Sequence, residues 1–157
     1  QATALLTIII MFIGGSPAGT AGGIKTTTVA MLLLVSRSSI KQAKDITTFR
    51  RRIPNELARK ATTIFIVAIV FVLLVTFLLT IIETDKDFLD ILFEVTSAFS
   101  TTGLTRGITT SLTTASKVII AATMLFGKLG PLTMMYAFTT KETPKAFREA
   151  EESIIVG

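Results

Sequence analysis

The stretch Ala61–Ile82 (ATTIFIVAIVFVLLVTFLLTII) contains no charged residue, and it limits what this chain can fold into more than any other feature. As an α-helix that rises about 1.5 Å per residue it would reach about 33 Å, which is enough to cross a bilayer. The alternative is a helix buried at the centre of a large soluble protein. A chain of 157 residues could hardly surround such a helix on all sides, so the stretch predicts a membrane-spanning helix.

The composition agrees with a membrane protein and excludes several chemistries. Half of the residues are hydrophobic and 17% are charged, whereas soluble domains carry roughly 25% charged residues. The chain has no cysteine and no histidine, which excludes disulfides, Cys/His zinc sites and thiol chemistry. It begins inside an apolar segment and without Met, so we expect a piece of a longer protein.

The segment 37–60 is basic and lies immediately before the apolar stretch. Its cations are Arg37, Lys41, Lys44, Arg50, Arg51, Arg52, Arg59 and Lys60. Short loops rich in Lys and Arg lie on the cytoplasmic side of membranes, so we place this loop and the tail 141–157 in the cytoplasm. Nucleic acid or anionic lipid are alternative ligands for such a segment, but neither is needed to explain it, and we expect no nucleic-acid partner.

Two other apolar segments, residues 2–13 and Phe88–Ser100, are too short to span a bilayer and predict re-entrant half-helices. Each precedes a polar, glycine-containing loop, Gly14–Thr28 and Thr101–Thr114 respectively. The last apolar segment, Val118–Thr140, is long enough to cross back to the inside. The order predicts a repeated unit of span, half-helix, loop and span.

The two loops resemble each other in sequence and suit a monovalent cation. Residues 20–25 (TAGGIK) align with residues 101–106 (TTGLTR). A half-helix places the negative end of its dipole at its C-terminus, where it favours cations, and uncharged backbone carbonyls replace the hydration shell of potassium in channel filters. No acidic residue lies in either loop, which disfavours a site for a divalent ion.

Three motifs, GGSPAGTAGGIKTTT, FSTTGLTRG and FGKLGPLT, together resemble the ion-translocating subunits of the Trk/Ktr/HKT potassium transporter family, most closely the bacterial KtrB type. The resemblance implies an all-α membrane protein in which four span–pore-loop–span repeats form one pore. By that resemblance residues 1–56 are the end of the third repeat, 57–140 are the fourth repeat, and 141–157 are a cytoplasmic tail, so that the chain is the C-terminal half of such a subunit.

The resemblance also implies a selectivity filter built from both loops, with Gly22 and Gly103 as its central glycines. The filter residues carried over by motif are Thr20, Ala21, Gly22 and Gly23 in the third repeat and Thr101, Thr102, Gly103 and Leu104 in the fourth. The only metal expected is potassium passing through these residues, and no cofactor is implied.

A gate beneath the filter is implied as well. In the family the helix after the third filter is broken by a polar intramembrane loop, for which the candidate here is the segment 36–40 (SRSSI), with Ser36, Ser38 and Ser39. The last helix of the family usually carries an arginine in GRxGPLT that projects into the pore, and Lys128 stands at that position. An ionisable residue midway along a span usually faces a cavity or a partner, although a lysine near the membrane edge would extend to water instead.

The glycines and the proline around Lys128, which are Gly127, Gly130 and Pro131, have two interpretations. They loosen the packing of the last helix, or they bend it near the pore. With the family resemblance, we expect the bend.

The resulting hypothesis is passive potassium transport through a pore in the plasma membrane, by a protein that is not an enzyme. The resemblance implies a homodimer in the lipid bilayer that pairs with a cytoplasmic nucleotide-binding regulatory subunit. An enzyme with a phosphate-binding P-loop is disfavoured, because Ile24 separates Gly23 from Lys25 and the required Gly-Lys pair is absent. Glycines that only serve helix packing and a broken-helix secondary transporter of another small solute remain as alternatives.

Overall fold

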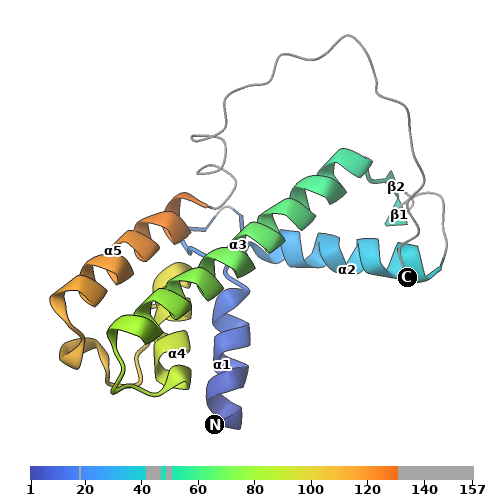
Figure 1. Cartoon of the computed structure of the whole chain (residues 1–157). Helices are drawn as coiled ribbons and strands as arrows, with labels where there is room; N and C mark the ends of the chain where they lie inside the picture. Colours follow the sequence, from blue (N-terminus) through green and yellow to red (C-terminus); the bar gives the residue numbers. More distant parts are fainter. Residues whose placement is uncertain (18, 42–46, 49–50, 131–157) are drawn as a thin grey trace, which may run out of the picture.

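The computed structural model describes residues 1–17, 19–41, 47–48 and 51–130, and this part of the chain is mostly helical (Figure 1). Its elements in chain order are α1 (Ala2–Phe12), α2 (Thr26–Ile40), β1 (Thr47–Thr48), β2 (Arg51–Arg52), α3 (Asn55–Ile82), α4 (Phe88–Ser100), the 3-10 helix η1 (Thr109–Ser111) and α5 (Thr114–Leu129). The strands form one short antiparallel pair in the basic segment, a detail that the all-α prediction did not include.

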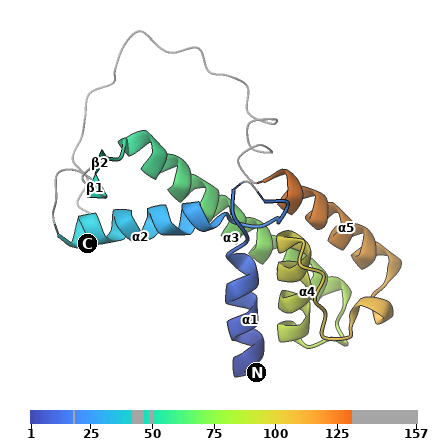
Figure 2. The same ribbon diagram turned by 180° about the vertical axis from the view of Figure 1, so that it is seen from behind.

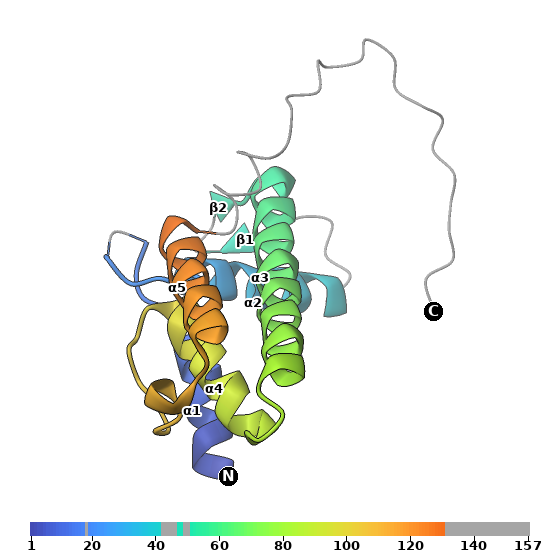
Figure 3. The ribbon, with the colours of Figure 1, turned by 60° about the vertical axis from the view of Figure 1, so that its left-hand side comes forward.

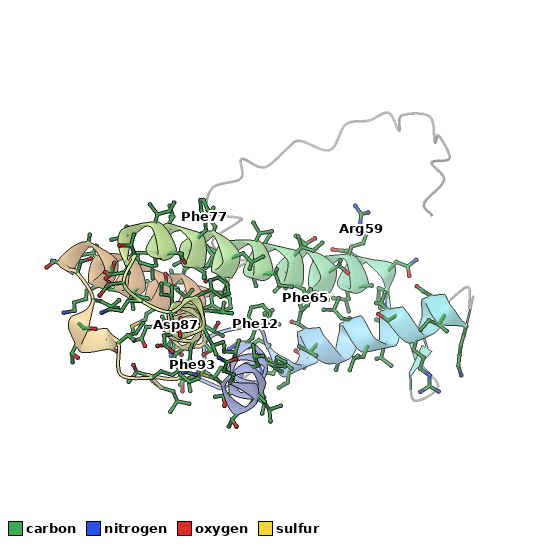
Figure 4. The ribbon with its side chains drawn as sticks, turned by 60° about the horizontal axis from the view of Figure 1, so that its bottom comes forward. Phe12, Arg59, Phe65, Phe77, Asp87 and Phe93 are labelled. Atoms are coloured by element: carbon green, nitrogen blue, oxygen red, sulfur yellow. The ribbon has the colours of Figure 1, made fainter. Side chains whose placement is uncertain are left out.

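Helix α3 organises the molecule and contains the whole stretch Ala61–Ile82 that is predicted to span the membrane. It has 28 residues, and it is the only helix in the described ranges that is long and apolar enough to cross a membrane. Pro54 stands at its N-terminal cap with φ −60°, where the fixed φ of proline suits a helix start. One face is buried against the other helices, while Phe77 is 66% exposed and points away from them, as Figure 4 shows.

The other helices pack along α3 in two groups. Helix α2 lies beside the N-terminal half of α3, whereas α4 and α5 lie beside its C-terminal half (Figures 1 and 3). Helix α1 packs against α4, so the two short helices stand side by side under α3. This arrangement brings the loops that follow α1 and α4 to the same region of the molecule, as the view from behind also shows (Figure 2).

A cluster of phenylalanines from four helices fills the space between these groups. The rings of Phe71 in α3 and Phe126 in α5 are stacked with centroids 3.8 Å apart. Phe99 of α4 packs against both, at 6.1 and 6.5 Å. Phe12 contacts Phe65 edge to face, with centroids at 6.2 Å, and Figure 4 shows this pair between α1 and α3. Because Phe12 and Phe99 lie at the C-terminal ends of α1 and α4, this aromatic core holds together the two helix ends from which the loops begin.

The expected short helices are present, with one difference in the region of the expected gate. Residues 2–13 contain α1, and Phe88–Ser100 is α4 with the predicted bounds. The segment 36–40, expected to be an irregular loop, is instead the C-terminal end of α2. The last helix begins at Thr114, before the expected Val118, and it ends at Leu129; residues 131–140 of the predicted span lie outside the described residues.

Glu83 connects the end of α3 to the beginning of α5. It is 3% exposed, and its Oε1 accepts hydrogen bonds from the backbone N and the Oγ1 of Thr113, at 2.8 and 2.7 Å. Thr113 is in turn the N-cap of α5, because its Oγ1 accepts from the backbone N of Ser116. The hydroxyls of Ser116 and Thr113 and the amide of Thr113 hold the pKa of Glu83 below its ordinary value of 4.5.

This lowered pKa predicts a pH-dependent contribution to stability. A carboxyl whose pKa is lower in the folded state stabilises the fold fully above pH 4.5 and loses that contribution as the pH falls through its folded pKa. We therefore expect Glu83→Gln to lower the thermal midpoint of the complete protein at pH 7, with the difference from wild type shrinking below pH 4.5. The measurement is thermal unfolding in detergent at both pH values.

Thr113→Val is the partner variant for this prediction, because it removes the hydroxyl bond to Glu83 and leaves the carboxylate in place. It also removes the N-cap bond to Ser116, a loss that does not depend on the charge of Glu83 and therefore persists at low pH. It should reproduce part of the loss at pH 7. A Glu83→Gln penalty that stays constant down to low pH would show that the carboxylate acts by shape alone.

Candidate functional site

The C-terminal ends of α1 and α4 meet at one place. Phe12 is the last residue of α1 and Phe99 lies next to the last residue of α4, and their rings are stacked with centroids 5.9 Å apart. The C-terminus of a helix carries about half a negative charge because its last carbonyls have no partner in the helix. Two such ends side by side make the space around both loops attractive to cations.

The loop between α1 and α2 and the loop after α4 are called the third-repeat loop and the fourth-repeat loop here, after the positions that the family resemblance implies for them. The third-repeat loop folds back on itself and docks against the fourth-repeat loop. Its return is fixed by the backbone bond from Ile24 N to Phe12 O, at 3.3 Å. The backbone N of Gly22 donates to Oγ1 of Thr101 at 2.9 Å. A Cβ on Gly22 would lie 2.8 Å from Thr101 Cγ2 and 3.0 Å from Phe99 O, so only glycine permits this contact between the loops.

The fourth-repeat loop begins with a left-handed turn directly after α4. Thr101 has φ +53°, and the backbone N of Thr102 donates to Ser97 O at 3.0 Å, which caps the helix in the manner of a Schellman motif. Oγ1 of Thr102 also lies 2.6 Å from Oγ of Ser100. Gly103 has φ +80°, and a Cβ added to it would meet no atom within 4 Å, so its backbone conformation, rather than lack of space, requires glycine.

The carbonyl oxygens of the two loops differ in what they bind. Those of Thr101, Thr102 and Gly103 accept no hydrogen bond from the residues that the structure describes. The carbonyls of Thr20 and Ala21 accept from the ammonium groups of Lys128 and Lys25, respectively. The third-repeat loop thus binds two cationic groups through its carbonyls, whereas the carbonyls of residues 101–103 have no hydrogen-bond donor among the described residues.

The two loops are not equivalent in the way that the letter alignment indicates. Thr101 directly follows α4, whereas α1 ends at Phe12, well before Thr20. Gly22 and Gly23 are buried and Gly103 is exposed. Residues 101–103 are the first three after α4, and the first three after α1 are residues 13–15. The match of TAGGIK with TTGLTR therefore has a different register from the match of the two helix ends.

A polar face on α4 was missed by sequence reasoning, which considered only the apolar residues of this helix. Asp90, Glu94 and Ser97 recur at the i, i+4, i+7 spacing that aligns residues along one helical face. The outgoing limb of the fourth-repeat loop, residues 102–109, runs back along this face. The helical spacing of these polar residues within a short apolar segment could have revealed this polar face from the sequence.

Each of the three residues of this face contacts the limb. After the bond from Thr102 to Ser97, Thr105 Oγ1 donates to Glu94 Oε2 at 2.8 Å and Thr109 Oγ1 donates to Glu94 Oε1 at 2.5 Å. The guanidinium Nε of Arg106 lies 2.5 Å from Asp90 Oδ1. That contact is an ion pair without the alignment of a hydrogen bond, and Oδ1 has no hydrogen-bond partner among the described residues.

The expected gate residues fall into two places. Lys128, near the end of α5, reaches the third-repeat loop through its bond to Thr20 O. Ser36, Ser38 and Ser39 lie in the last turns of α2, at the end far from the loops in Figure 1. At about 1.5 Å per residue, they are about 15 Å or more along the helix from its start at Thr26.

The fold and the site together define a class: a mostly helical protein with one helix long and apolar enough to span a membrane, and two short helices whose C-terminal ends meet beside two neighbouring loops. The family of cation transport proteins named TrkH matches residues 1–149, and the chain belongs to this family. This family is a class of cation transporter and not a class of enzyme.

Curated relatives support the same assignment. The chain is 41% identical to the Ktr system potassium uptake protein B of Bacillus subtilis over 90% of its own length and 32% of that protein. It is 34% identical to the potassium/sodium uptake protein NtpJ of Enterococcus hirae, over 98% of the chain and 35% of that protein. It is also 32% identical to the Ktr system potassium uptake protein B of Vibrio alginolyticus, over 100% of the chain and 34% of that protein. The chain thus spans about a third of the length of these relatives.

Proposed function

We propose that this chain forms part of the ion pathway of a potassium-transporting membrane protein. The observation that carries the proposal is the meeting of the α1 and α4 C-termini at two loops, one of which has available carbonyls at residues 101–103. Such a site suits a weakly hydrated monovalent cation, because neutral oxygens can replace its water shell. Family membership and the names of the relatives, which are potassium or potassium/sodium uptake proteins, point the same way.

The architecture under this proposal is the end of one span–pore-loop–span repeat, residues 1–56, followed by a complete repeat, residues 57–140, and a tail. Helices α1 and α4 are the re-entrant half-helices and α3 is a span. Irregular backbone at membrane depth persists only where protein buries it or where it lines a water-filled cavity, which is the situation of a pore loop. The basic segment 37–60 and the tail face the cytoplasm, and the membrane is the plasma membrane.

Within the site, the filter comprises the fourth-repeat residues 101–104 and the third-repeat residues 20–23. The structure favours the fourth-repeat residues as the part of the filter that meets the ion, since Gly103 is exposed while Gly22 is buried. Lys128 forms the gate from the side of the third-repeat loop, with the serines at 36, 38 and 39 as a second candidate element.

The complete protein under this proposal is a homodimer in the bilayer with a cytoplasmic nucleotide-binding regulatory subunit. Two copies of a TrkH-family chain and a separate regulator would together set when the pathway opens. The competing proposal, a broken-helix secondary transporter of another small solute, predicts saturable uptake that an organic substrate competes for.

The test is rubidium uptake into proteoliposomes that hold the complete parent protein, with sodium as competitor. We expect Gly103→Ser to reduce potassium-over-sodium selectivity about tenfold, because the left-handed conformation costs a residue with a side chain about 1–2 kcal/mol. Ala115→Ser, which adds a hydroxyl group on the exposed first turn of α5, should keep wild-type selectivity. Unchanged selectivity in Gly103→Ser would contradict the filter assignment, and an absence of cation flux in wild type would contradict the proposed function.

A further inference from the structure

One buried carboxylate, that of Glu94, accepts two of the hydrogen bonds that hold the outgoing limb of the fourth-repeat loop to α4. We infer that Glu94 is a positioning residue, which sets ion selectivity by fixing the limb that follows Gly103. This inference rests on the proposed function. It concerns a residue that the motif resemblance did not include and that lies outside the proposed filter.

The loop needs a support of this kind because its central residue has none. A Cβ added to Gly103 would have no atom within 4 Å, and Leu104 is exposed. The nearest anchors are Thr102 on one side, bonded to Ser97 and Ser100, and Thr105 on the other, bonded to Glu94. The backbone between these anchors is therefore positioned from its two ends.

Glu94 suits this role because each of its oxygens accepts a separate hydroxyl. Oε2 accepts from Thr105 and Oε1 accepts from Thr109, at 2.8 and 2.5 Å, and the residue is only 6% exposed. Hydrogen bonds to an ionised acceptor are shorter and stronger than those between neutral groups. The neighbouring cation Arg106 pairs with Asp90, so in the described part of the chain the carboxylate of Glu94 is satisfied by hydroxyls.

An electrostatic role, in which the Glu94 charge attracts the ion, makes different predictions. Thr109→Val keeps the charge and the side-chain shape but removes one hydroxyl bond to the carboxylate. If Glu94 acts by positioning the limb, Thr109→Val should alter ion selectivity although it changes no charge. If Glu94 acts by attracting the ion, Thr109→Val should leave selectivity unchanged. Glu94→Gln removes the charge and retains one acceptor oxygen. A positioning role therefore predicts a loss of selectivity that is smaller than the loss expected if both hydroxyl bonds were removed.

The experiment uses the complete parent protein in proteoliposomes, with rubidium uptake against sodium competition. Losing one hydrogen bond to a carboxylate costs about tenfold in an equilibrium that depends on it, so we expect Thr109→Val to lower potassium-over-sodium selectivity about three- to tenfold. The matched control is Thr110→Val, because the Thr110 side chain is exposed and only its backbone oxygen is used, by Lys117; it should match wild type.

Hydrogen exchange provides a readout that does not depend on transport. The amides of residues 105–107 should exchange faster in Thr109→Val and Glu94→Gln than in wild type or Thr110→Val. Unchanged exchange and unchanged selectivity in both variants, with selective flux in wild type, would overturn the role of Glu94 and leave the proposed function intact. Wild-type protein without cation flux would overturn the proposed function, even if exchange at residues 105–107 became faster as expected.

Discussion

Replacing Gly127 with alanine is expected to prevent α5 from packing on α4 and so to remove the stably folded transporter. A Cβ at Gly127 would lie 1.8 Å from the carbonyl oxygen of Phe99 and 2.7 Å from its carbonyl carbon. Both are backbone atoms at the end of α4, so no side-chain rotation relieves the overlap. The two helices would have to move apart, and this would separate Phe126 from Phe99 and disturb the turn at Thr101.

The sign of the stability change in Gly127→Ala distinguishes a close helix contact from the ordinary effect of helix propensity. In an ordinary helix interior, glycine to alanine stabilises by about 1 kcal/mol through helix propensity. At Gly127 the expected change is a destabilisation of about 3 kcal/mol or more, since overpacking a close contact typically costs about 1–3 kcal/mol and here the contact is with backbone.

Thermal unfolding of the complete protein in detergent, followed by size-exclusion chromatography, measures this change. Ala122→Gly on the exposed side of the same helix is the control, and it should lower the midpoint only by the propensity difference. A midpoint that rises in Gly127→Ala would show that α5 and α4 do not make this close contact.

Features that depend on local sequence were predictable. The stretch Ala61–Ile82 identified the long apolar helix α3, because a helix without charges needs only length and composition to be recognised. The short helices α1 and α4 were predicted for the same reason, since their apolar runs are short and each ends at a polar loop. Local pattern also placed Lys128 within an apolar segment, where a charge demands a partner.

Features that depend on contacts between distant segments were not predictable. The bond between Gly22 and Thr101 joins residues 79 positions apart, and that between Lys128 and Thr20 joins residues 108 positions apart. The two glycine loops were aligned by their letters, but that alignment did not show that the loops differ in register relative to the ends of α1 and α4. Gly127 was interpreted as part of a bend, yet it lies inside α5 at the closest approach to Phe99.

The roles of the two buried glutamates also depend on contacts between distant segments and could not be predicted from local sequence. In the sequence Glu83 is an ordinary charge just after one apolar segment, and Glu94 is a charge in the middle of another. Their roles emerge only when the fold brings Thr113 to one and Thr105 and Thr109 to the other. A carboxylate satisfied by hydroxyls has no fixed sequence spacing to its donors, unlike a salt bridge on one helix face.

Replacing Lys128 with methionine is expected to raise potassium flux about tenfold under the proposed function. The ammonium of Lys128 sits on the carbonyl of Thr20, beside the loops proposed to form the filter. A unit charge about 10 Å from a passing cation contributes about 1.7 kcal/mol of repulsion at an effective dielectric constant of about 20, which corresponds to about tenfold in rate. Methionine keeps an unbranched side chain of similar length and removes the charge.

Lys128→Arg distinguishes two roles of Lys128, which are electrostatic repulsion of the passing cation and a hydrogen bond that holds the third-repeat loop in place. Arginine keeps the positive charge but replaces the compact ammonium with a planar guanidinium, so flux should stay near wild type if charge is the cause. Rubidium uptake at matched protein density, with increasing salt as a second variable, gives the comparison. Flux that falls in Lys128→Met at normal protein levels would mean that the bond to Thr20 holds the third-repeat loop in its conducting shape, and that the lysine supports the pathway instead of closing it.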